Sequence, residues 1–127
     1  MQCSTAYFGT LESYPSTWDE ETRSVAFMAG VTCRYYARGT ACEDKHVQYL
    51  CAEVVYDRLA EIERRGWTAR AEKYMQFDHS AFGWPSMLRW AHDKRQEGFA
   101  WRRDYAERIA NKGTSKRSTA SRFRTDG

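Results

Sequence analysis

Apolar residues recur at helical spacing in the middle of the chain. They fall three or four positions apart, which is the period of a helix with one buried face: Val47, Leu50, Cys51, Val54, Leu59 and Ile62. The run ends at Arg64, Arg65 and Gly66, the basic last turn and glycine cap expected of a helix end. The pattern predicts a helix that begins after a capping box of Thr40 and Glu43 and stops there.

A first helix is expected directly before that one. Thr17 and Glu20 have the three-residue spacing of a capping box, and the acidic residues around them suit a helix amino terminus. The helical pattern ends near Gly39, within a residue or two of the next start. The two helices are therefore expected to form a tight helical hairpin.

Three further helical segments are predicted after Gly66. They cover about residues 69–77, behind a Thr68 cap, and then about 85–97 and 99–111, the last with Trp101, Tyr105 and Ile109 on one face. Gly98 either separates the last two segments or lies inside one longer helix, where glycine costs about 1 kcal/mol relative to alanine. Gly113 is expected to end the regular structure.

These elements predict an all-α protein, a compact bundle of about four to five helices. Residues 1–15 lack helical periodicity and are expected to form an extended arm that lies on the helical body, residues 16–112. Residues 113–127, GTSKRSTASRFRTDG, are expected to be a Ser/Thr/Arg-rich basic tail without a core of its own. A chain of 127 residues is one domain by length.

The composition is poor in aliphatic residues and rich in the residue types of binding sites. Leu, Ile, Val and Phe number 17, below the roughly one fifth typical of globular domains, and eight Tyr and five Trp supply bulk instead. Trp, Tyr and Arg are enriched in binding hot spots, and Arg outnumbers Lys 15 to 5. This composition is typical of a subunit more than of a monomer, although a GC-rich genome would also raise the arginine content.

Charge divides unevenly along the chain. Residues 1–93 carry 10 basic and 13 acidic side chains, whereas residues 94–127 carry 10 and 4. No apolar run approaches 18 residues, so no membrane span is expected, and the amino terminus lacks the pattern of a secretory signal. We expect an intracellular protein, cytoplasmic by default, and leave a mitochondrial location open.

Three cysteines and a histidine lie within CRYYARGTACEDKHVQYLC, residues 33–51. Cys33, Cys42, His46 and Cys51 are zinc-ligand types, but Cys42 and Cys51 are nine residues apart and face opposite sides of one helix. Disulfides Cys33–Cys42 and Cys3–Cys51 are a second alternative. They resemble the paired-cysteine helical hairpins of mitochondrial intermembrane-space proteins, although eight residues instead of nine separate the cysteines. Free cysteines packed as small apolar residues are the favoured interpretation.

Two constellations invite a catalytic interpretation. His46, His92, Asp93 and Asp104 resemble the ligands of the helical HD phosphohydrolases in type and order but not in spacing. Glu53, Asp57 and Glu61 resemble the magnesium ladder of helical nucleotide pyrophosphatases, but a solvated face paired with Arg58, Arg64 and Arg65 explains them better. No phosphate loop or nucleophile elbow is present. We expect no enzyme activity, no cofactor and no metal, with a metal-dependent phosphohydrolase as the alternative.

The basic carboxyl end carries the strongest functional signal. Trp84 or Trp101 is predicted to anchor an interface, and the other candidate partner-binding residues are Arg102, Arg103, Lys116, Arg117, Arg122, Phe123 and Arg124. We expect a non-enzymatic helical interaction protein that binds one or more larger proteins, as an accessory subunit of a multiprotein assembly. One alternative is a small virus-encoded inhibitor that blocks a host or defence complex. The other is binding of RNA, DNA or acidic lipid through residues 99–111 and the tail.

Overall fold

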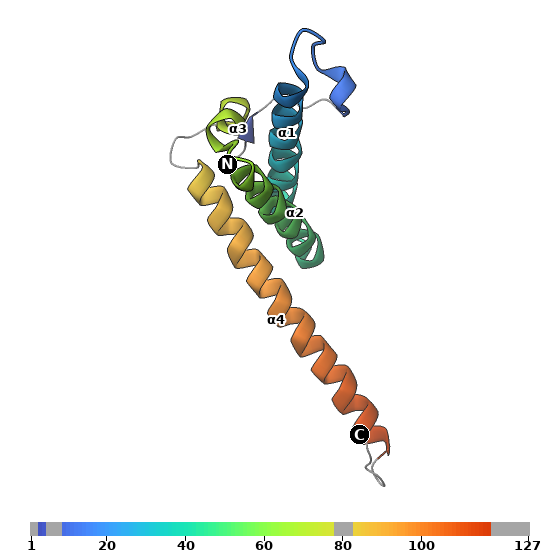
Figure 1. Cartoon of the computed structure of the whole chain (residues 1–127). Coiled ribbons are helices and arrows are strands. Elements are labelled where there is room, and N and C mark those ends of the chain that lie inside the picture. The colour runs from blue at the N-terminus through green and yellow to red at the C-terminus, as the bar shows by residue number, and fades with distance from the viewer. Residues whose placement is uncertain (1–2, 5–8, 78–82, 118–127) are drawn as a thin grey trace. The chain divides into compact units, whose positions relative to one another are not determined.

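The structure is a computed structural model that describes residues 3–4, 9–77 and 83–117, with side chains described for residues 9–75 and 83–112. In chain order the elements are β1 (Cys3–Ser4), the 3-10 helix η1 (Leu11–Ser13), α1 (Glu20–Ala41), α2 (Lys45–Arg64), α3 (Thr68–Tyr74), β2 (Gln76–Phe77) and α4 (Trp84–Arg117). Apart from one pair of two-residue strands, the regular structure described is helical, which confirms the all-α prediction (Figure 1).

The predicted hairpin is present, but its helices begin later than expected. Asp19 caps α1 by accepting a 2.8 Å hydrogen bond from the Thr22 N–H, and Asp44 caps α2 through the His46 N–H at 2.8 Å. Aspartate is at least as good a cap as threonine, and its charge is favourable at a helix amino terminus. The hydrogen bonds from Thr22 lower the pKa of Asp19.

The predicted cap at Thr40 is wrong, whereas α1 ends two residues after the end predicted near Gly39. α1 continues to Ala41, and the Thr40 hydroxyl donates a 2.9 Å hydrogen bond to the Tyr36 carbonyl inside the helix. A threonine hydroxyl bonds equally well to the preceding turn, so it does not force a helix to start. The end of α2 is as predicted, because Arg65 caps the helix and Gly66 follows with a φ of 72°.

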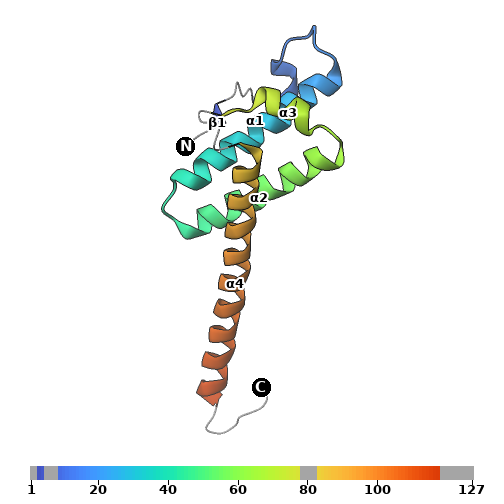
Figure 2. The same ribbon diagram turned by 90° about the vertical axis from the view of Figure 1, so that its left-hand side faces the viewer.

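The chain divides into two compact units, residues 1–95 and 96–127. The core of the first unit draws residues from all four α-helices. α1 packs on α2 and α3 (Figure 2), and the first turns of α4 contribute the buried Trp84, Met87 and Ala91. The other buried members of the core are Val25, Ala29, Cys33, Tyr36, Val55, Leu59, Ile62, Trp67, Ala71 and Met75. Alanine, tyrosine, tryptophan and methionine supply much of this core, as the composition indicates.

Residues of the arm lie against the helices of the first unit. The Tyr14 ring is buried and stacks on Trp18 with centroids 5.9 Å apart, and Trp18 in turn lies 5.7 Å from Tyr74. β1 pairs antiparallel with β2, so that Cys3 stands opposite Phe77 in the register. The predicted helix over residues 69–77 is therefore too long, because the chain leaves α3 at Tyr74 to form this strand.

α4 is one uninterrupted helix of 34 residues. It passes through Gly98, which resolves the alternative that the sequence leaves open. It also passes through Gly113 and ends at Arg117, so the predicted end at Gly113 is wrong. A helical glycine costs only about 1 kcal/mol relative to alanine, which the flanking helix-forming residues outweigh.

Candidate binding surfaces

Aromatic and basic side chains share one side of α4 in the second unit. Trp101, Tyr105 and Ile109 recur every four residues, and Arg108 lies among them on the helix surface. The Trp101 and Tyr105 rings stack with centroids 5.5 Å apart and planes inclined by 10°. The Arg108 guanidinium lies 5.8 Å from the Tyr105 ring centroid. We call these four residues the α4 face.

Apolar area on the α4 face is open to solvent. Tyr105 is 49% exposed and Ile109 is 52% exposed. Apolar side chains at helical spacing usually mark the side of a helix that packs against something. The α4 face therefore has the character of a contact surface.

Charge on this part of α4 is mixed. Residues 96–112 carry four basic and three acidic side chains. Arg103 pairs with Asp104 at 4.0 Å, and Arg102 lies over Phe99 with its guanidinium 5.1 Å from the ring centroid. Because carboxylates alternate with the cations, this segment does not form a uniformly basic surface.

A second apolar surface lies on the α1–α2 hairpin in the first unit. A groove there is lined by Tyr35 and Arg38 of α1 and by Val47, Leu50, Cys51, Glu53, Val54 and Asp57 of α2. Leu50 is 63% exposed, and Val47 and Val54 are only half-buried. We call this surface the hairpin groove.

The prediction that Leu50 lies on the core face of α2 is wrong, because Leu50 is exposed. The buried positions of α2 are Cys51, Ala52, Val55, Leu59 and Ile62. Leu50 and Leu59 are nine residues apart, about two and a half helical turns, so they point to opposite sides of the helix. The same rule separates Cys42 from Cys51, and applying it to the leucines would have revealed the second apolar side.

The predicted binding residues divide into three groups. Trp84 is only 7% exposed and belongs to the core, so we leave it out of the binding surface, whereas Trp101 lies on the α4 face. Arg102 and Arg103 are exposed on the same helix. Lys116 and Arg117 lie in the last turn of α4, with side chains outside the described set, and Arg122, Phe123 and Arg124 lie outside the described residues.

The cysteines are not paired across the hairpin. Cys33 is disulfide-bonded, while Cys42 and Cys51 are free thiols, so the predicted Cys33–Cys42 and Cys3–Cys51 disulfides are both wrong. α1 runs to Ala41, which places Cys33 nine residues before Cys42, about 13 Å along the helix axis and beyond the reach of a disulfide. The interpretation as free cysteines holds for Cys42 and Cys51 but is wrong for Cys33.

Thiol labelling of the native protein is expected to modify Cys42 first. Cys51 is only 3% exposed, and burial raises the pKa of its thiol, so that less of the reactive thiolate is present. Cys51 should therefore react only after unfolding, and Cys33 only after reduction. Peptide mapping after alkylation under each condition measures this order, and labelling of Cys33 without reduction would contradict the assignment.

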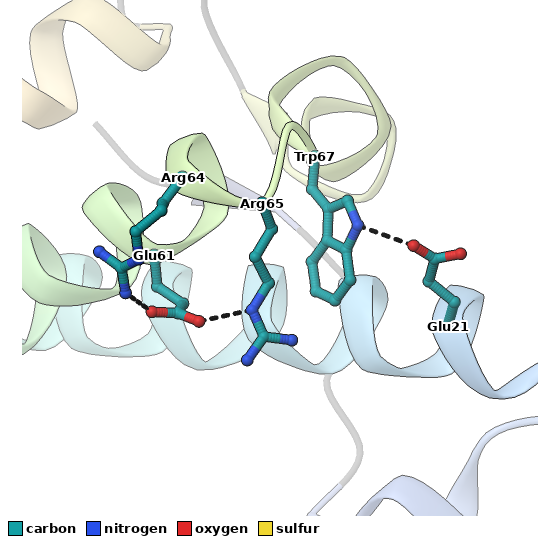
Figure 3. Close-up of polar contacts among 5 residues, drawn as sticks. All are labelled: Glu21, Glu61, Arg64, Arg65 and Trp67. Carbon is teal, nitrogen blue, oxygen red and sulfur yellow. Dashed lines mark hydrogen bonds and ion pairs between the residues drawn. The ribbon is translucent and has the colours of Figure 1, made fainter.

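The acidic ladder of α2 is paired where it meets the helix end (Figure 3). Glu61 forms ion pairs with Arg64 and Arg65, which confirms the expected pairing for this member of the ladder. Arg65 also lies over the Trp67 ring, 4.9 Å from its centroid.

Trp67 is also hydrogen-bonded to α1. Its Nε1–H donates a 2.9 Å hydrogen bond to Glu21 (Figure 3). Glu21 is also paired with Arg70 at 3.4 Å. These contacts join the start of α1 to the end of α2 and to α3. Their arrangement is that of a structural polar cluster.

The residues proposed as metal ligands do not lie close together in the described part of the chain. His92 Nδ1 lies 3.4 Å from Asp93 Oδ1 on an exposed surface, and its ring lies 6.4 Å from that of Tyr56. Within the side chains that the structure describes, no three His, Cys, Asp or Glu residues are close enough together to hold one ion. Neither the zinc set nor the phosphohydrolase set finds support there.

A membrane-spanning helix is absent from the described residues, because no helix there combines sufficient length with sufficient apolar character. Comparison of the chain with known protein families, with curated proteins and with solved structures finds no match.

Proposed function

We propose that this chain is a non-enzymatic helical interaction protein, an accessory subunit of a larger assembly that it binds through the α4 face. The observation that carries the proposal is the exposure of Tyr105 and Ile109, one turn apart on a helix and next to the stacked Trp101. An amphipathic helix that lays such residues into a groove of its partner is a recurring mode of protein recognition.

The chemistry of the α4 face suits a binding hot spot. Trp, Tyr and Arg dominate hot spots because they bury large areas with few rotatable bonds and can still satisfy a polar tip. The Trp101 and Tyr105 rings already stack on one another within the single chain. Less side-chain entropy is therefore lost on binding.

The inhibitor alternative would use the same surface, and the two settings differ in stoichiometry. A subunit is held in a species of fixed composition, whereas an inhibitor titrates its target reversibly.

Binding of RNA or DNA has weaker support, because carboxylates alternate with cations along residues 96–112. Nucleic-acid binding would fall steeply with salt concentration.

Replacing Tyr105 with alanine is expected to weaken partner binding by about 30-fold, the effect of losing one hot-spot residue worth roughly 2 kcal/mol. Phe99→Ala is the matched control, because Phe99 is also a partly exposed aromatic residue but lies about 200° around the helix from Trp101. Native mass spectrometry of complexes isolated from the source cells measures the bound fraction. Retention of the complex by a Trp101→Ala/Tyr105→Ala variant would rule out the α4 face as the partner site.

A further inference from the structure

α2 has two apolar sides, and only one of them is covered. The covered side contains Leu59 and Ile62, while the open side contains Val47, Leu50 and Val54 and borders the hairpin groove. Asp57 continues the open side one turn beyond Val54. This side therefore changes from apolar to acidic over about two turns of helix.

The α4 face has the same spacing with the opposite charge. Leu50, Val54 and Asp57 follow one another at intervals of four and three residues, and Trp101, Tyr105 and Arg108 follow at the same intervals. Each set covers about 10 Å of helix. If two such helices lie parallel and in register, Leu50 meets Trp101 and Val54 meets Tyr105. The Asp57 carboxylate then meets the Arg108 guanidinium.

We propose that the hairpin groove of one copy of this chain binds the α4 face of a second copy. The proposal rests on the proposed function, because it keeps the α4 face as the binding surface and makes a second copy of this chain the component of the assembly that the face contacts. The occupant is specified by the matched spacing and by the opposite charges of Asp57 and Arg108. The groove also presents the exposed Leu50 and Tyr35, which suit the rings of Trp101 and Tyr105.

The contact is heterologous, since two different surfaces of the chain meet. A heterologous contact either closes as a small oligomer or repeats and builds larger ones. Both forms depend on the same residues. The parallel alignment of two short apolar stripes makes the contact small, so we expect association in the micromolar range, about 8 kcal/mol.

Sedimentation velocity of the purified full chain over a range of concentrations tests the proposal. The wild-type protein is expected to associate as its concentration rises. Leu50→Asp and Tyr105→Asp should each shift the concentration dependence by about tenfold or more, because each places a charge in an apolar contact. Phe99→Asp is the matched control and should associate like the wild type. A monomer at every concentration, or association unchanged by Leu50→Asp, would overturn the proposal.

Charge exchange separates a specific contact from loss of folding. Asp57→Arg and Arg108→Glu should each weaken self-association, because like charges then meet. An equimolar mixture should recover it, because the groove of Asp57→Arg then meets the α4 face of Arg108→Glu in opposite charge. Failure of the mixture to recover association would show that the two residues do not meet.

These results are separable from those for the proposed function. If the pure protein is a monomer but the Tyr105→Ala variant loses its cellular complex, the proposed function holds and the self-association is ruled out. If the protein self-associates through these residues but Tyr105→Ala leaves the cellular complex unaffected, self-association holds and the α4 face is ruled out as the site for the cellular partner.

Discussion

Replacing Leu59 with alanine is expected to lower the free energy of unfolding by about 2–5 kcal/mol. Leu59 is only 1% exposed and lies in the core cluster with Val25, Val55 and Ile62. Truncation removes buried methyl groups and leaves a cavity that the surrounding helices fill only in part. A small domain is stable by only about 5–15 kcal/mol, so the variant should lose a large share of its stability.

Leu50→Ala is the matched control, because it makes the same chemical change two and a half turns earlier on the same helix. Leu50 is 63% exposed, so its truncation should change the free energy of unfolding by no more than about 0.5 kcal/mol. Urea unfolding followed by far-ultraviolet circular dichroism measures both variants. The experiment belongs at low protein concentration, where self-association does not add to the apparent stability.

Equal losses for the two leucines would contradict the two-sided description of α2. A large loss at Leu50 would mean that the hairpin groove is covered within a single chain. A small loss at Leu59 would mean that the core is assembled differently. The pair of variants therefore tests the premise of the proposed self-association without measuring association at all.

The helices of the hairpin could be predicted from the sequence because their signals are local. The basic turn and Gly66 end α2 where expected, and Gly66 has the positive φ that favours glycine. The starts were misplaced by two and four residues, because Thr17 and Thr40 match the capping pattern as well as Asp19 and Asp44 do. Only the backbone geometry shows which side chain reaches an unpaired N–H.

Long-range features could not be predicted in the same way. Pairing of β1 with β2 joins residues more than 70 positions apart, and nothing in the segment containing Gln76 and Phe77 distinguishes a strand from the last turn of α3. The disulfide state of Cys33 is similarly non-local, since four cysteines allow three pairings and local spacing suggested only one of them. Burial of Trp84 also depends on where α4 begins to pack.

The candidate binding surface was predicted in part. The spacing of Trp101, Tyr105 and Ile109 was visible in the sequence, because one helix face is a local property. The hairpin groove was missed, because six apolar positions of α2 were treated as one stripe although Leu50 and Leu59 point in opposite directions. A check of helical angles, not only of spacing, would have separated them.

Replacing Gly39 with alanine is expected to destabilise the fold by up to about 2 kcal/mol, although alanine is the better helix former. A Cβ built on Gly39 would lie 2.5 Å from Cη2 of Trp90 and 2.9 Å from the Cβ of Cys51. Overpacking of this kind costs about 1–3 kcal/mol, and the gain in helix propensity, about 1 kcal/mol, offsets only part of it. Gly39 is thus a residue that lets α4 approach α1 closely, not a residue that ends α1.

Two further variants make this prediction specific. Gly9→Ala should be nearly neutral, because a Cβ built there meets no atom within 4 Å. In a Trp90→Leu background the cost of Gly39→Ala should fall, because the ring that blocks the new methyl group has been removed. A double-mutant cycle of unfolding free energies measures this coupling.

The sign of the Gly39 effect decides how tightly the first turns of α4 belong to the fold. If Gly39→Ala stabilises the protein, Trp90 does not lie against α1 in solution, and the change in the free energy of unfolding reflects helix propensity alone. If it destabilises the protein and Trp90→Leu relieves the cost, the contact between Tyr36 and Trp90, with ring centroids 5.4 Å apart, anchors α4. The first turns of α4 would then be a fixed part of the core of the first unit.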